Sequence, residues 1–302
     1  MHSSAVHRGA QHVRSQWNCL VATIERLELA SPNMYSQHNP FGLTKVYNFR
    51  LVAENSADLN QNLVYRSANF TNATPGDVHI LLNVLSIKTY IDLRTDTGHA
   101  FSHSFSGTMK RLHYSVADRL QPMSSSSIKE VREFYDRHFS DGDQLFEDPA
   151  RHELFLRNYM IFCSKYNGPI IASVLRAFAD QSNYPIVFGC HAGKDRTGLV
   201  ALLLLKICGV DDQQIVLDYL MSNMGLGSKT TGGVGGAVYL GALKGLLQWM
   251  VATHGSVLNY IRSTGLREHE LRAIRNILCV DPTQNTLPAP DTQNTWAGTC
   301  KL

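Results

Sequence analysis

The most informative stretch of this chain reads Phe188-Gly189-Cys190-His191-Ala192-Gly193-Lys194-Asp195-Arg196-Thr197-Gly198. It follows Tyr184–Phe188 (YPIVF), whose apolar and β-branched residues predict a buried strand. It runs into Thr197–Cys208, a nearly all-apolar segment that predicts a core helix and has about half the length that a membrane span needs. A strand, a loop and a helix in this order put the loop at the carboxyl end of a strand, where α/β sheets bind ligands.

A cysteine and an arginine flank five residues in this loop, and the residue types suit the binding of a phosphate. Such a loop can turn successive backbone N–H groups into one concavity, and the following helix adds the positive end of its dipole. Gly193 allows unusual backbone dihedrals, and Arg196 can donate to two phosphate oxygens at once. The same positive field favours the thiolate of Cys190, which is the nucleophilic form, and Thr197 can hydrogen-bond that sulfur.

These properties predict that Cys190 attacks a phosphate ester while Arg196 holds the phosphoryl oxygens. The residues expected to bind phosphate are His191, Ala192, Gly193, Lys194, Asp195, Arg196 and Thr197. The alternative is a buried cysteine beside a capping loop. A bare Cys-x5-Arg occurs often by chance, but its combination with Gly, Lys, Asp, Thr and Gly between an apolar strand and an apolar helix is far more specific.

Patterns of strand and helix alternate along much of the remaining chain, which indicates an α/β fold. Strands are predicted at 63–66, 88–93 and 111–116, in addition to the one before the loop. Helices are predicted at about 74–86, 151–166, 169–181, 211–223, 239–253 and 266–280. The first of these helices has the clearest start, because Thr74 can cap it, Pro75 suits its first position and Asp77 its first turn.

Composition excludes several classes of function. The net charge is +3, which is too small for a nucleic-acid-binding surface but compatible with an anionic substrate or a lipid headgroup. None of the six cysteines forms a CxxC pair or a Cys/His cluster, so no metal site and no cofactor are expected. Most of the cysteines lie in apolar surroundings and are predicted to be buried thiols.

The central loop resembles the signature loop of the protein-tyrosine-phosphatase superfamily, and its GKDRTG form resembles that of the atypical tyrosine and lipid phosphatases. Further matches cover about residues 46–280. They are Asn48-Phe49-Arg50, Tyr65-Arg66-Ser67, Ile91-Asp92-Leu93-Arg94, Asp218-Tyr219-Leu220-Met221-Ser222-Asn223 and the pattern Tyr260, Leu266, Leu271-Arg272, Leu278. The resemblance implies a phosphatase-like α/β fold with a central, mostly parallel sheet flanked by helices and a helical lid or insertion.

The resemblance also implies a reaction through a phosphocysteine intermediate, with a carboxylic acid that protonates the leaving oxygen. Two candidates for this acid remain open. Asp118 follows a predicted strand where relatives carry an acid loop, and it is slightly preferred; Asp195 lies inside the signature loop. Asp92 and Arg94 are expected to form a buried structural pair.

One residue departs from the family, because Gly189 stands where a histidine usually precedes the cysteine and orders the loop. His191 is expected to face outward.

Lys194 and Asp195 bear on the substrate. A lysine in the loop resembles the tensin-homologue lipid phosphatase, and an aspartate before the arginine resembles the myotubularin and Sac-domain lipid phosphatases. The extra positive charge suits a headgroup with several phosphates. We therefore expect activity on phosphotyrosine and phosphoinositides, with phosphoserine and phosphothreonine as further candidates. The expected partners are phosphorylated proteins, phosphoinositide headgroups and a membrane surface.

Three alternative functions remain open. The main alternative is a catalytically weak or dead module that binds phosphoinositides or phosphoproteins on the same fold. A sulfur-transfer or arsenate-reducing enzyme would also use a loop thiol but lacks the GKDRTG continuation, and a non-enzymatic scaffold is the third alternative.

The expected organisation is an N-terminal extension at 1–45, a phosphatase domain at 46–280 with an inserted helical segment at about 120–165, and a disordered tail at 281–302. The glycine-rich segment Gly225–Gly236 predicts a hinge or a flexible lid. No signal peptide or membrane span is recognised, so a cytoplasmic location is expected. The last three residues, Cys300-Lys301-Leu302, are a variant of the S-K-L address, which makes a peroxisome-type organelle the alternative location.

Overall fold

The computed structural model describes residues 41–54, 56–95, 105, 107–116, 158–160, 162–163, 167–226 and 240–282. Several predictions fall outside these residues: most of the N-terminal extension, Asp118, most of the inserted segment and of the helix at 151–166, the glycine-rich residues 227–236, and the tail with its last tripeptide. The tail and the extension therefore stay predictions, as does the lid.

The centre of the fold is a five-stranded sheet in the order β1-β2-β5-β3-β4. The strands are β1 (Arg50–Leu51), β2 (Val64–Ser67), β3 (Thr89–Asp92), β4 (Lys110–His113) and β5 (Ile186–Gly189). All neighbouring pairs are parallel except β1 with β2. Ser67 of β2 and Asp92 of β3 are both in register with Gly189 of β5. Three parallel strands thus end together at the residue before Cys190.

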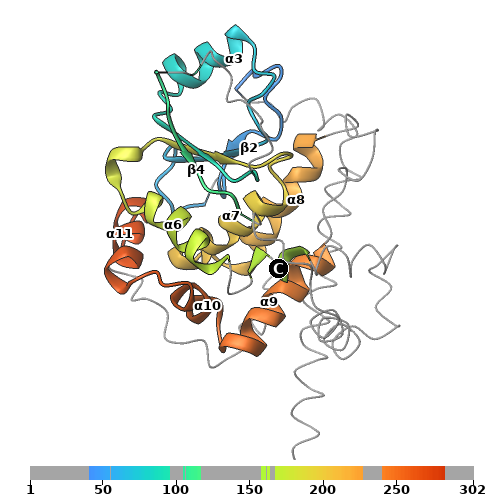
Figure 1. Ribbon diagram of the computed structural model, residues 1–302, viewed down its shortest axis with the longest axis vertical. Helices are drawn as coiled ribbons and strands as arrows, with labels where there is room; N and C mark the ends of the chain where they lie inside the picture. Colours follow the sequence, from blue (N-terminus) through green and yellow to red (C-terminus); the bar gives the residue numbers. More distant parts are fainter. Residues whose placement is uncertain are drawn as a thin grey trace, which may run out of the picture.

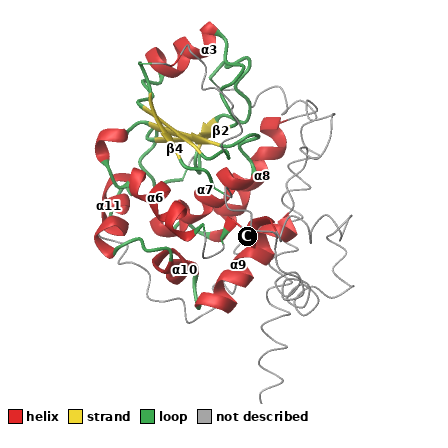
Figure 2. Cartoon of the chain, in the orientation of Figure 1, coloured by secondary structure: helices red, strands yellow, loops and turns green. Residues whose placement is uncertain are grey.

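Helices cover both faces of this sheet (Figure 1). One face carries α3 (Pro75–His79) and the π-helical turn η1 (Ile80–Val84). The other face carries the larger set, coloured red with α3 in Figure 2: α6 (Gly168–Phe178), α7 (Asp195–Cys208), α8 (Asp212–Leu226), α9 (Leu240–His254), α10 (Val257–Ser263) and α11 (Glu268–Leu278). A short 3-10 turn, η3 (Gln181–Asn183), leads into β5.

Each face of the sheet has its own hydrophobic core. Along β5, Ile186 and Phe188 join the large cluster under α6–α11, whereas Val187 joins the small cluster under α3. Alternation of this kind follows from the period of two in a strand, and both faces are apolar because both are covered. Helix α7 is buried along nearly its whole length and contacts α6, α8, α10 and α11 as well as β2 and β5. It is the central helix that the sequence predicts.

The predicted fold class is confirmed, and the differences concern element boundaries and two short elements. Thr74 caps α3 with a capping box that includes Asp77, as its sequence indicates. Helix α8 runs to Leu226, so the first two residues of the predicted hinge are helical. Strand β1 and helix α10 were not predicted, because two residues and seven residues are too short for a periodic pattern. Within the described residues, no helix combines the length and the apolar character that crossing a membrane requires.

Candidate active site

The loop between β5 and α7 brings the predicted phosphate-binding residues together. Strand β5 ends at Gly189 and α7 begins at Asp195, so Arg196 lies in the first turn of the helix rather than before it. Cys190 is buried, at 3% exposure. The guanidinium of Arg196 donates to the carbonyl of Leu93 at 3.3 Å, which ties it to the end of β3. His191 is exposed, as expected from the sequence.

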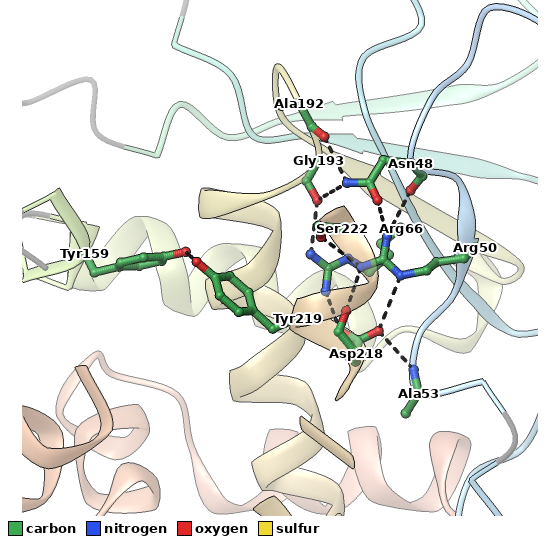
Figure 3. A network of polar contacts seen from close by, with 10 residues as sticks. All are labelled: Asn48, Arg50, Ala53, Arg66, Tyr159, Ala192, Gly193, Asp218, Tyr219 and Ser222. Atoms are coloured by element: carbon green, nitrogen blue, oxygen red, sulfur yellow. Dashed lines mark hydrogen bonds and ion pairs between the residues drawn. The ribbon is translucent and has the colours of Figure 1, made fainter. Parts of the chain in front are cut away.

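The carbonyl groups of the loop are bound from outside it. The carbonyl of His191 accepts from the backbone N–H of Asn69 at 3.2 Å and from its side chain at 2.9 Å. The side-chain amide of Asn48 donates to the carbonyls of Ala192 and Gly193, both at 3.0 Å (Figure 3). With three successive carbonyls held on the outer side, the N–H groups of the loop can converge on an anion on the inner side.

Two glycines allow this loop to lie directly against β2. A Cβ atom on Gly193, which has φ +68°, would lie 2.3 Å from the carbonyl oxygen of Ser67. A Cβ atom on Gly189 would lie 2.7 Å from the same oxygen and 3.1 Å from that of Ala68. Both contacts are with backbone atoms, which cannot swing aside. Gly189 is therefore required by the close approach of β2, and the histidine usual in the family has no space here.

A buried ionic network supports the loop from below (Figure 3). Arg66 of β2 forms an ion pair with Asp218 of α8 and donates to the carbonyl of Gly193 at 3.0 Å. Arg50 of β1 approaches the same carboxylate at 3.8 Å, donates to the carbonyl of Asp218 at 2.7 Å and also binds the side-chain oxygen of Asn48. These three ionisable residues are each at most 4% exposed. Two guanidinium groups thus share one carboxylate.

The network leaves positive charge behind the loop. Burial, together with the charge of Arg66, lowers the pKa of Arg50 to about 9, and the negative charges of Asp218 and Glu54 oppose this shift. A group with that pKa still carries its proton at neutral pH. An excess of positive charge in a medium of low polarity attracts an anion much more strongly than the same charge in water. The electrostatics of the site therefore favour a bound phosphate group.

Asp195 combines partial burial with positive neighbours. Its side chain is 30% exposed and lies 3.9 Å from the ammonium of Lys194. Desolvation by burial raises the pKa of Asp195, although Lys194, Arg196, the Tyr159 hydroxyl and Arg66 all act in the opposite direction. A carboxyl group whose pKa is raised retains its proton to a higher pH, as a general acid must.

One predicted contact in the loop needs correction. The hydroxyl of Thr197 is buried and has no hydrogen-bond partner within the described part of the chain, so its predicted bond to the Cys190 sulfur is not formed. The side chain of Lys194, for which no exposure was predicted, is buried, at 2% exposure. Its charge lies inside the protein, beside Asp195.

The predicted pair of Asp92 and Arg94 is confirmed as a buried structural element. Arg94 donates to both carboxylate oxygens of Asp92, at 2.9 and 2.8 Å, and Arg111 of β4 donates to one of them at 2.7 Å. Burial would raise the pKa of Asp92, but these ion pairs outweigh it and the pKa is lowered. Asp92 is thus an ionised carboxylate that joins β3 to β4, and it is not a proton donor.

Several residues around the loop had no predicted role: Asn48, Arg66, Asn69 and Tyr159. The sequence offers two signals for these residues. Asn48 and Arg66 lie in motifs that match the family, and Arg66 lies within a short apolar strand, where a buried arginine requires a partner. Among the residues that the structure describes, no group of three or more His, Cys, Asp or Glu side chains could hold a metal ion. The four described cysteines, Cys163, Cys190, Cys208 and Cys279, are free and buried, as predicted.

The model of the tyrosine phosphatase family matches residues 41–280, which include the whole of this site. The chain belongs to that family. Its similarity to curated relatives is lower and more local: it is 28% identical over 130 residues to a tyrosine-protein phosphatase of Nostoc commune, which is 36% of this chain and 44% of that protein.

Two further relatives give the same range of similarity. A putative tyrosine-protein phosphatase of Cupriavidus necator is 28% identical over 166 residues, 55% of each chain. The triple specificity protein phosphatase PtpB of Mycobacterium tuberculosis is 30% identical over 123 residues, which are 31% of this chain and 44% of that protein. The chain thus spans about half the length of the curated relatives that it matches.

Proposed function

We propose that this protein is a cysteine-dependent phosphatase that hydrolyses phosphomonoesters. The observation that carries the proposal is the loop from Cys190 to Arg196, whose carbonyls are held outward by Asn48, Arg66 and Asn69. Family membership supports the same conclusion. A loop held in this way is organised for an anion before the anion binds, so little reorganisation is needed when charge develops in the transition state.

The reaction proceeds in two steps. In the first, a bond forms between the Cys190 sulfur and phosphorus, the bond from phosphorus to the ester oxygen breaks, and that oxygen receives a proton from a carboxylic acid. In the second, a water oxygen attacks phosphorus, the sulfur–phosphorus bond breaks, and the same carboxylate accepts a proton from the water. Arg196 donates to two phosphoryl oxygens throughout, as its planar fork allows.

Asp195 is the proton donor that the site supports best. It lies within the loop and its pKa is raised, mainly by burial. Asp118 is the alternative acid, and it lies outside the described residues. Asp195→Asn and Asp118→Asn distinguish the two, because loss of the acid reduces hydrolysis of phenyl phosphate about 100-fold or more but affects p-nitrophenyl phosphate much less.

The substrate class that we propose includes phosphotyrosine and phosphoinositides. Phosphotyrosine follows from the family, and the name of the Mycobacterium tuberculosis relative gives that protein phosphatase a triple specificity. Phosphoinositides are proposed because Lys194 and Asp195 of the loop resemble those of lipid phosphatases. The buried ammonium of Lys194 adds to the positive field of the site without extending toward solvent. Phosphate release from a panel of phosphotyrosine, phosphoserine and phosphothreonine peptides and of phosphoinositides in vesicles ranks these substrates directly.

The test of the function is Cys190→Ser. A serine hydroxyl is not ionised at neutral pH, so this variant should bind inorganic phosphate but release none from p-nitrophenyl phosphate. Arg196→Lys should lose both activity and phosphate affinity, because an ammonium group cannot replace the planar fork. Turnover by Cys190→Ser above a tenth of that of the wild type would exclude Cys190 as the nucleophile. A wild-type protein that binds phosphate but does not hydrolyse p-nitrophenyl phosphate would instead support the alternative function, a catalytically dead module that binds phosphoinositides or phosphoproteins.

A further inference from the structure

Two buried tyrosines outside the loop lie beside Asp195, and one of them approaches the same carboxylate oxygen as the ammonium of Lys194. The hydroxyl of Tyr159 is 3.4 Å from Asp195 Oδ1 and 2.8 Å from the hydroxyl of Tyr219, and Figure 3 shows the two tyrosines meeting through these hydroxyls. Tyr159 is 1% exposed and Tyr219 is 2% exposed. Each hydroxyl has one proton. The Tyr159 hydroxyl has donor geometry toward both Tyr219 and Asp195, and its single proton serves one of them at a time. When Tyr159 donates to Asp195, the Tyr219 hydroxyl can rotate to donate to Tyr159.

The position of this pair is fixed by the packing of α7 against α8. A Cβ atom on Gly198 would lie 3.1 Å from the ring of Tyr219, so only glycine lets the ring approach α7 this closely. Gly198 follows Asp195 by three residues, which is about one helical turn. Asp218, the neighbour of Tyr219, is bound to Arg66. Two contacts therefore hold the tyrosine hydroxyls near the loop. One is the close packing of the Tyr219 ring on Gly198, and the other is the ion pair between Asp218 and Arg66, which also binds the loop.

The hydroxyl of Tyr159 is suited to donate to a carboxylate. Burial raises the pKa of Tyr159 well above that of a free phenol, so the hydroxyl keeps its proton throughout the neutral range. The charged groups that act on Asp195 are Lys194 and Arg196 of its own loop and Arg66 of β2. Tyr159 adds to these a neutral donor, from a segment remote in the sequence, aimed at one carboxylate oxygen.

We propose that Tyr159, held by Tyr219, is a positioning residue for Asp195 and stabilises the carboxylate that remains after Asp195 has given its proton to the leaving oxygen. This inference rests on the proposed phosphatase function. In the first step the proton moves from Asp195 to the ester oxygen as the phosphorus–oxygen bond breaks. Tyr159 retains its own proton and strengthens its hydrogen bond as negative charge develops on Asp195.

The experiment is Tyr159→Phe, which removes the hydroxyl and keeps the ring. Profiles of kcat/KM against pH are measured with phenyl phosphate, whose leaving group needs protonation, and with p-nitrophenyl phosphate, whose leaving group does not. On the low-pH plateau, phenyl phosphate hydrolysis should fall about fivefold, in the range for loss of one ordinary intramolecular hydrogen bond, while p-nitrophenyl phosphate hydrolysis stays nearly unchanged. The descending limb at high pH should move upward, because the bond from Tyr159 lowers the pKa of Asp195.

Three further variants complete the test. Tyr219→Phe should shift both readouts in the same direction by less, and it keeps the proposal testable should Tyr159→Phe fold poorly. Tyr184→Phe is the matched control, since it also loses a buried tyrosine bond, at 2.6 Å to the carbonyl of Phe178, but away from the loop. In an Asp195→Asn background, Tyr159→Phe should have no further effect on phenyl phosphate.

The outcomes separate this inference from the proposed function. Loss of turnover in Cys190→Ser together with unchanged profiles in both tyrosine variants would overturn the role of Tyr159 and leave the phosphatase intact. The role of Tyr159 would also be overturned if Tyr159→Phe reduced phenyl phosphate hydrolysis equally in the wild type and in the Asp195→Asn variant. Absence of Cys190-dependent turnover in the wild type would refute the function itself.

Discussion

At residue 189 the chain has a glycine because the neighbouring strand leaves no space for a side chain. The carbonyl oxygens of Ser67 and Ala68 would lie 2.7 and 3.1 Å from a Cβ atom there. A histidine in this position orders the loop in the family that the sequence resembles. Here the loop is instead held by direct contact with β2 and by the amide of Asn48. Strand β2 and the Asn48 side chain therefore order the loop here, in place of the histidine side chain.

This interpretation predicts that restoring the family residue damages the protein. Gly189→His, and even Gly189→Ala, should lower the free energy of unfolding by about 1–3 kcal/mol through overpacking against backbone atoms and should reduce turnover. Urea unfolding and p-nitrophenyl phosphate hydrolysis measure the two effects. Gly76→Ala is the control, because a Cβ atom there meets only the Thr74 hydroxyl, at 3.7 Å. A fully active and stable Gly189→His would show that β2 can move away.

At the scale of elements, the loop is supported by segments that are far apart in the sequence. Asn48 precedes β1, Arg66 lies in β2 and Asp218 lies in α8, and all three contact the loop or one another. The carbonyl of Gly225 also accepts from the backbone of Asn48 at 3.1 Å, which joins the end of α8 to the same network. The geometry of the loop therefore depends on how β1, β2 and α8 pack together.

Asp218→Asn tests this dependence. The substitution keeps the shape of the side chain but leaves Arg50 and Arg66 buried without a carboxylate, which should destabilise the protein by about 3–5 kcal/mol. Phosphate affinity should also fall as the loop loosens. Glu268→Gln is the matched control, because Glu268 pairs with Arg262 where both side chains are more than 30% exposed, and loss of such a pair changes stability by less than about 1 kcal/mol. Equal losses in the two variants, measured by urea unfolding, would contradict a structural role for the buried network.

The elements next to the loop were predictable, and their surroundings were not. The apolar run before Cys190 predicts a strand, and the one after Arg196 predicts a helix. Both β5 and α7 therefore follow from the local sequence. The roles of Asn48 and Tyr159 depend on contacts across 144 and 36 residues of sequence. Local patterns contain no information on such contacts. The lack of space for a side chain at Gly189 results from the position of Ser67 and Ala68, so the loop sequence alone could not reveal it.

At the scale of the whole molecule, three carboxylates join parts of the fold that are distant in the chain. Asp77 binds the backbone N–H groups of Thr44, Lys45 and Thr74 and so fastens the layer of α3. Asp92 joins β3 to β4 through Arg111. Glu270 of α11 pairs with Arg176 of α6 at 2.8 Å. In all three, burial acts to raise the pKa, but the hydrogen bonds and ion pairs outweigh it and the pKa is lowered.

Lowered carboxyl pKa values predict a loss of stability in acid. Each of these groups stabilises the folded state above its unfolded pKa, and the contribution disappears as the pH falls through the lower, folded pKa. Asp195 has the opposite sign, since its raised pKa means that protonation relieves an unfavourable buried charge. The pKa of Asp180 is lowered as well, and burial lowers the pKa of His254, so protonation of this histidine favours the unfolded state. The free energy of unfolding from urea titrations should therefore fall slightly from pH 7 to 5 and steeply below about pH 4. Asp77→Asn should be less stable than the wild type at pH 7, and the difference should shrink as the pH falls below about 4. Asp195→Asn should be at least as stable as the wild type at pH 7. A parallel pH dependence of Asp77→Asn and the wild type would show that Asp77 does not contribute through its ionised form.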